Sequence, residues 1–198
     1  MARRLVERTP ARIFFDDEVP YFVNRVEESY ELYFHEHEFT EICYVGEGSG
    51  FHYIEEETLP VNRGDLFVLP VGASHVFRPR SAKSGEPLVV YNFIYMADRA
   101  ARALHGYPDL QLSAETLQLT NLAPGRPAWR HIRDAGGDCH AYFTKAYREF
   151  HQRQAGFLPR MHALFVLLLT EIDRHLHPPG GTAQGLPHAL LPIGDHFT

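Results

Sequence analysis

The chain has 198 residues, of which 44% are hydrophobic and 22% are charged, and its formal net charge is −6. Such a chain can bury a full core, so its composition excludes a disordered protein. The acidic balance and the scattered basic residues argue against direct DNA binding by this chain.

The sequence also indicates the cellular compartment in which the protein acts. The longest uninterrupted apolar run, residues 163–169, is too short to cross a bilayer, so we expect no membrane partner. The first residues, Met-Ala-Arg-Arg-Leu, lack the apolar segment of a secretion signal. Only two cysteines are present, and a reduced, cytoplasmic state is the simpler expectation.

The first group of candidate ligands lies on a strand predicted over residues 32–46. Side chains alternate between the two faces of a strand, so His35, His37 and Glu41, all odd-numbered, point to one side. The glycine-rich segment at residues 46–50 ends this strand and predicts a hairpin turn.

A second predicted strand, over residues 66–69, leads to another candidate ligand. Pro70 and Gly72 predict a turn that directs His75 back towards the first group. Imidazoles and a carboxylate that converge in this way suit a divalent metal such as zinc, nickel, iron or manganese. The alternative is a hydrogen-bonded polar cluster that serves an organic ligand or only itself. The candidate metal ligands are His35, His37, Glu41 and His75.

The alternating segment 88–96 predicts a further strong strand. We expect its tyrosine-bearing face to line an effector pocket, because aromatic rings and hydroxyl groups together suit a hydroxylated ligand. The alternative is that these rings only fill the interior of the fold. The predicted pocket residues are Tyr91, Phe93, Tyr95 and, from the strand over 32–46, Cys43.

Two helices are predicted towards the end of the chain, over residues 138–154 and 158–176, with a break at Gly156. The second helix is apolar around most of its circumference in its middle turns. Such a helix needs cover on more than one side, so we expect a homodimer through these helices. The alternative is burial wholly within one monomer.

Two segments carry a resemblance to a known family. Residues 35–41, followed by Gly48, resemble the first cupin motif, and residues 64–75 resemble the second. The glycine that usually opens the first motif is replaced by Ser29, and the asparagine that usually closes the second by Pro79. These departures suggest a divergent branch of the cupin superfamily. The amino-acid sequence of both segments is similar to that of the N-terminal sensor domain of AraC-type transcriptional regulators.

The resemblance implies a mainly β fold, a cupin double-stranded β-helix or jelly-roll barrel followed by a C-terminal helical pair. Residues 1–97 would form the effector-binding barrel with an N-terminal arm, and residues 98–177 a connecting segment and the helical dimerisation region. Residues 178–198 would be a linker and the start of a DNA-binding region that this chain lacks.

The implied function is to sense a small-molecule effector, such as a sugar, and to control transcription. DNA would be bound only through the missing helix-turn-helix region, and the sensor itself would have no catalytic residue. The alternative is a metal-dependent cupin enzyme, an oxygenase or isomerase that acts on a small hydroxylated compound, in which the metal would bind substrate or dioxygen.

Overall fold

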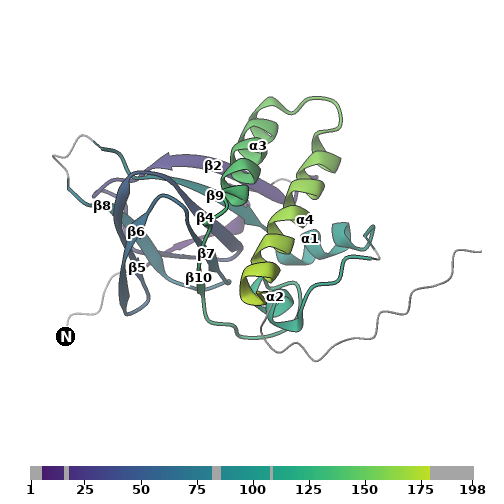
Figure 1. Cartoon of the computed structure of the whole chain (residues 1–198), viewed down its shortest axis with the longest axis horizontal. Coiled ribbons are helices and arrows are strands. Elements are labelled where there is room, and N and C mark those ends of the chain that lie inside the picture. The colour runs from purple at the N-terminus through teal and green to yellow at the C-terminus, as the bar shows by residue number, and fades with distance from the viewer. Residues whose placement is uncertain (1–5, 16–17, 82–85, 108, 179–198) are drawn as a thin grey trace, which may run out of the picture.

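The computed structural model describes residues 6–15, 18–81, 86–107 and 109–178, so nearly all of the predicted linker and DNA-binding start lies outside the described residues. Two five-stranded sheets enclose one core, and helices cover the outer side of the second sheet (Figure 1). The first sheet has the order β1 (Glu7–Thr9), β3 (His35–His37), β8 (His75–Pro79), β5 (Ser49–Ile54) and β6 (Glu57–Asn62). The second has the order β10 (Arg130–Arg133), β7 (Asp65–Leu69), β4 (Thr40–Glu47), β9 (Val89–Tyr95) and β2 (Tyr21–Glu27). The helices are η1 (Ala11–Ile13, a 3₁₀ turn), α1 (Ala97–Leu104), α2 (Ala114–Leu119), α3 (Asp138–Gln152) and α4 (Phe157–Leu176). This arrangement confirms the expected mainly β barrel followed by a helical pair.

The central strand β4 shows how the sequence builds two cores. It lies between β7 and β9, and every residue but the last is buried. Its odd-numbered side chains, such as Cys43 and Val45, join the core between the two sheets. Its even-numbered side chains, such as Ile42 and Tyr44, join the core beneath the helices. A strand covered on both faces must be apolar on both, which is the pattern of residues 42–45.

The predicted hairpin after β4 turns at Gly48. Its φ angle of +75° lies in the left-handed region, and a Cβ atom there would lie 2.1 Å from the carbonyl oxygen of Pro87. Only glycine fits both conditions without a shift of the neighbouring backbone.

The two long helices pack side by side on the outer face of the second sheet (Figure 1). Phe143 of α3 stacks on Tyr44 with ring centroids 5.3 Å apart, and Phe165 of α4 stacks on Phe93 at 5.7 Å. Strands and helices therefore share one continuous core. Among the described residues, no helix combines the length and the apolar character needed to cross a bilayer.

The orientation of β9 corrects the predicted effector pocket. Tyr91, Phe93 and Tyr95 point to the helices and belong to the core beneath them. The even-numbered residues Asn92 and Ile94 face the interior of the barrel instead. Both faces of β9 are covered, so alternation along the strand defines two faces without showing which of them is internal.

Candidate functional site

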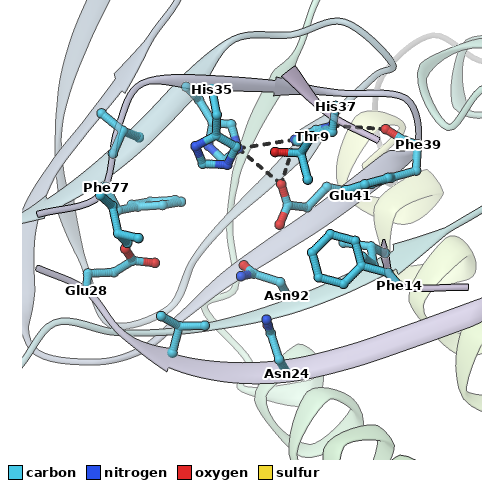
Figure 2. A pocket seen from close by; sticks show the side chains of 15 residues that line it. Thr9, Phe14, Asn24, Glu28, His35, His37, Phe39, Glu41, Phe77 and Asn92 are labelled. Atoms are coloured by element: carbon cyan, nitrogen blue, oxygen red, sulfur yellow. Dashed lines mark hydrogen bonds and ion pairs between the residues drawn. The ribbon is translucent and has the colours of Figure 1, made fainter. Parts of the chain in front are cut away.

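A cavity of about 220 Å³ opens at one end of the space between the sheets. Its polar side chains form two opposite walls (Figure 2). One wall holds the histidines and Glu41, and the other holds Asn24, Glu28 and Asn92. Rings such as Phe14 complete the lining.

Strand pairing brings the candidate metal ligands together. His35 and His37 occupy the two ends of the short strand β3, and His35 pairs directly with His75 of β8. Glu41 comes from β4 in the opposite sheet, after a short bend. The two motifs are distant in sequence but adjacent at this end of the barrel.

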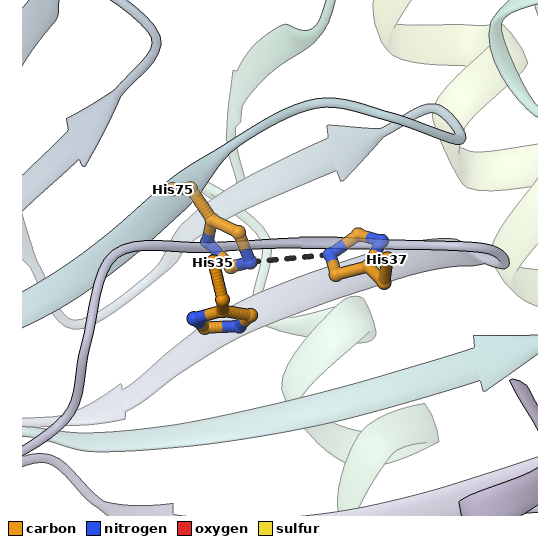
Figure 3. Close-up of side chains that lie close together, drawn as sticks. All are labelled: His35, His37 and His75. Atoms are coloured by element: carbon orange, nitrogen blue, oxygen red, sulfur yellow. Dashed lines mark hydrogen bonds between the residues drawn. The ribbon is translucent and has the colours of Figure 1, made fainter. Parts of the chain in front are cut away.

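The cluster of these side chains is tightly packed. The Oε2 atom of Glu41 lies 2.8 Å from Nε2 of His37 and 3.1 Å from Nε2 of His75. The two Nε2 atoms are 3.2 Å apart (Figure 3). One ring nitrogen from each of His35, His37 and His75 lies within 4.8 Å of the others. The Glu41 carboxylate meets the nitrogens of His37 and His75, and His35 lies beside that pair.

Backbone carbonyl groups orient two of the imidazole rings. The Nδ1 atom of His35 lies 3.0 Å from the Tyr33 carbonyl oxygen, and that of His37 lies 3.0 Å from the Phe39 carbonyl oxygen. A carbonyl oxygen only accepts hydrogen bonds, so each Nδ1 atom must carry the proton and donate it. Outer partners of this kind leave Nε2 directed at the cluster, as metal-binding histidines require.

Burial and pairing compete in setting the charges of the cluster. Burial alone would raise the pKa of Glu41, but the charge and hydrogen bonds of His37 and His75 hold it well below its ordinary value. Burial lowers the pKa of His37, yet the charge and hydrogen bond of Glu41 outweigh it and raise that pKa overall. For His75, burial prevails and lowers the pKa to about 4. Pairing therefore prevails over burial for Glu41 and His37, and burial prevails over pairing for His75.

Sequence reasoning missed His52, which extends the cluster into the barrel. It is fully buried on β5, stacks on Phe77 at 3.9 Å, and places Nε2 at 3.0 Å from Nδ1 of His75. Burial, followed by the charge of His75, keeps the pKa of His52 well below its ordinary value. The sequence could have indicated this position, because His52 lies two residues before the apolar Ile54 and alternate residues of a strand share one face.

The remaining predicted site residues lie elsewhere. Cys43 packs in the barrel core beneath Glu41, within 4.8 Å of its carboxylate, and does not line the cavity. The predicted aromatic pocket of Tyr91, Phe93 and Tyr95 is wrong, because these rings contact the helices. The wall opposite the histidines was not predicted, although Asn92 is the one polar side chain on the internal face of β9.

The donor set fits a divalent transition metal. Ligand atoms about 2.1 Å from an ion stand roughly 3 Å from one another in octahedral geometry. The contacts of 2.8, 3.1 and 3.2 Å between Glu41, His37 and His75 agree with that spacing. The same distances also suit direct hydrogen bonds, so the geometry accommodates both a metal and a protonated polar cluster.

A two-sheet barrel with a polar cavity and helices on one outer face defines a small-molecule-binding domain of the cupin type. The model of the AraC-like ligand binding domain matches residues 20–127, more than half of the chain. The chain belongs to this family.

The relatives found by sequence are regulators. The HTH-type transcriptional activator RhaR of Enterobacter sp. (strain 638) is 27% identical over 160 residues, which cover 79% of this chain and 51% of the relative. RhaR of Klebsiella pneumoniae is 27% identical over 160 residues, covering 79% and 52%. The chain therefore spans about half the length of the curated relatives that it matches.

A solved structure shares the fold. Wild-type ToxT from Vibrio cholerae strain SCE256, solved with an unsaturated fatty acid bound, aligns with a TM-score of 0.54 and 11% identity. The match covers 81% of this chain and 57% of ToxT. At this identity the likeness concerns the arrangement of strands and helices alone.

Proposed function

We propose that the chain is the effector-sensing part of an AraC-type transcriptional regulator that acts in the cytoplasm. The observation that carries this proposal is the cavity, where polar side chains from β2, β3, β4, β8 and β9 converge within a domain of this family. DNA would be contacted through a helix-turn-helix region of the kind named in the relatives.

The N-terminal arm, here residues 6–15, could transmit the effect of effector binding to the rest of the regulator. Strand β1 pairs in parallel with β3, with Glu7 opposite His35, and both Thr9 and Phe14 line the cavity. An effector in the cavity would touch the arm directly. It would shift the equilibrium between arm positions to the extent that it binds them with different affinity.

Calorimetric titration with small metabolites tests the sensing proposal. We expect a compound to bind the wild-type protein and to fail with Val26→Phe, which fills part of the cavity from β2. Circular dichroism would verify that this variant is folded. Equal affinity in both proteins would place binding outside the cavity and contradict the proposal.

We further propose that His35, His37, Glu41 and His75 hold a divalent transition metal. When bound, the metal would supply open coordination positions for an oxygen-bearing ligand. Elemental mass spectrometry should find close to stoichiometric metal in the wild-type protein and a loss of it in His35→Ala/His37→Ala. Asn24→Ala, on the opposite wall, is the matched control. If wild-type protein contains no metal even after growth and dialysis with added metal, the metal proposal is wrong. The cavity would then be a pocket for an organic effector alone.

A metal-dependent oxygenase or isomerase is the second candidate function, and the complete donor set facing a cavity favours it. Such an enzyme would show turnover of a small hydroxylated compound that depends on added metal and disappears in His37→Ala. The regulator is preferred because the family model and the relatives point to it.

The outer face of α4 supports a homodimer. Leu167 is 41% exposed although it lies in the middle of an apolar helix, and Ala163 beside it is exposed as well. We expect Leu167→Glu to shift the protein to monomers, because a charge in a helix interface is desolvated without a partner. Thr58→Glu, exposed on the distant strand β6, should leave the dimer intact. Sedimentation velocity over a range of concentrations would measure both, and unchanged mass in Leu167→Glu would refute this interface.

A further inference from the structure

The three imidazole rings of the candidate metal site are held from behind in two different ways. Backbone carbonyl groups hold the Nδ1 atoms of His35 and His37. The Nδ1 atom of His75 lies 3.0 Å from Nε2 of His52 instead. One ring of the site therefore depends on a second side chain for its orientation.

Packing fixes the ring of His52. This residue is fully buried on β5, and its ring stacks on Phe77 with centroids 3.9 Å apart and an interplanar angle of 9°. Phe67 meets it edge to face at 4.4 Å. Its Nδ1 atom has no hydrogen-bond partner within the part of the chain that the structure describes. His52 is thus hydrogen-bonded to the site through Nε2, and this atom faces the back of His75 rather than the cavity.

The proton between these two rings has two positions. A neutral imidazole has one donor nitrogen and one acceptor nitrogen. When Nε2 of His75 carries the proton, it can donate to the Glu41 carboxylate 3.1 Å away, and Nδ1 accepts a hydrogen bond from His52. A metal ion requires the lone pair of Nε2, so the proton of His75 must then lie on Nδ1 and point at His52. The His52 ring can donate in the first arrangement and accept in the second.

The arrangement with a bound ion depends more on this contact than the empty one does. The positive charge of the ion makes the Nδ1–H group of its imidazole ligand a stronger donor, so the hydrogen bond from His75 to His52 strengthens on binding. Without an acceptor at this position, the same N–H group would be buried against the apolar core that contains Phe67 and Phe77. The difference between the two states changes the metal affinity.

We propose that His52 is a positioning residue for the divalent transition metal: it accepts a hydrogen bond from Nδ1 of His75 and so keeps the lone pair of Nε2 free and directed at the ion. This inference rests on the proposed metal site and adds a residue that is not one of its four ligands. It gives a role to a polar ring that is buried among phenylalanine side chains.

Zinc binding to matched variants tests this role. His52→Phe keeps an aromatic ring in the stack on Phe77 but offers no acceptor. Its zinc affinity, measured by competition with a chromophoric chelator, should fall about 10- to 100-fold. His52→Gln places an amide oxygen near the same position and should recover most of that loss. The control is His131→Phe, because His131 stacks on Phe67 at 4.6 Å but pairs with Asp65 rather than with a metal ligand. Its zinc affinity should match that of the wild type.

A second measurement locates the proton itself. Nuclear magnetic resonance of zinc-loaded wild-type protein with ¹⁵N-labelled histidine should show the proton of His75 on Nδ1. It should also show scalar coupling across the hydrogen bond to Nε2 of His52. Circular dichroism would verify the fold of each variant. If His52→Phe does not fold, the coupling in the wild type decides.

The outcomes separate this role from the metal site itself. Zinc affinity that is unchanged in His52→Phe, or lost equally in His52→Phe and His52→Gln, would overturn the role of His52 and leave the metal site standing. Zinc-loaded wild-type protein without coupling between the two rings would have the same meaning. Wild-type protein that binds neither zinc nor another metal would overturn the metal site and this inference together.

Discussion

Replacing Phe165 with alanine is expected to lower the free energy of unfolding by about 3–5 kcal/mol. Phe165 is fully buried at the interface of α4 and the second sheet. Its ring lies 5.7 Å from that of Phe93, 4.6 Å from Tyr95 and 5.3 Å from Tyr21. Truncation would remove these contacts and leave a cavity that the rigid strands β2 and β9 cannot fill. Urea unfolding followed by circular dichroism would measure the loss.

The control for this prediction is Phe51→Ala. Phe51 lies half-buried on β5 in the other sheet, away from the helices. Its replacement with alanine should lower the free energy of unfolding by only about 1 kcal/mol. An equal, small loss in both variants would mean that α4 does not pack on the sheet in solution. The helical pair would then be unable to connect effector binding to a dimer interface.

Replacing Glu28 with glutamine is expected to stabilise the protein at neutral and alkaline pH. Burial, and then the charge of Glu41, raise the pKa of Glu28 from about 4.5 to about 8, with Arg78 opposing the shift. The folded state therefore holds this proton more tightly than the unfolded state. The resulting stabilisation is complete below pH 4.5 and is lost as the pH rises towards 8. Glutamine does not titrate, so Glu28→Gln avoids the loss.

The expected difference is about 4 kcal/mol at pH 8, since the pKa of Glu28 lies about 3.5 above its ordinary value and each pKa unit corresponds to about 1.4 kcal/mol. Unfolding in urea at a series of pH values between 5 and 8.5 would show the two proteins diverging as pH rises. Glu27→Gln, exposed on the same strand, should follow the wild-type profile. Parallel profiles for wild type and Glu28→Gln would contradict the buried, unpaired position of this carboxyl group.

The sequence by itself determined the barrel and the first wall of the site. His35 and His37 lie on the same face of β3, and the turn after Leu69 returns His75 to them, so short-range geometry brings the three histidines together. The predicted single strand over residues 32–46 is wrong, because a bend at residues 38–39 separates β3 from β4. Glu41 meets the histidines because the two sheets face each other. The boundaries of the helical pair followed in the same way, because apolar spacing and the break at Gly156 act within a few residues.

Only the tertiary structure decided which face of each strand is internal. Strand β9 is covered by the barrel on one side and by α3 and α4 on the other, so the apolar residues of its two faces are indistinguishable by periodicity. The rings of Tyr91, Phe93 and Tyr95 therefore lie under the helices, while Asn92 faces the cavity. The wall of Asn24, Glu28 and Asn92 depends on the pairing of β2 with β9, which joins residues nearly 70 positions apart in the sequence. No short-range pattern carries that information, because it resides in the order of the strands.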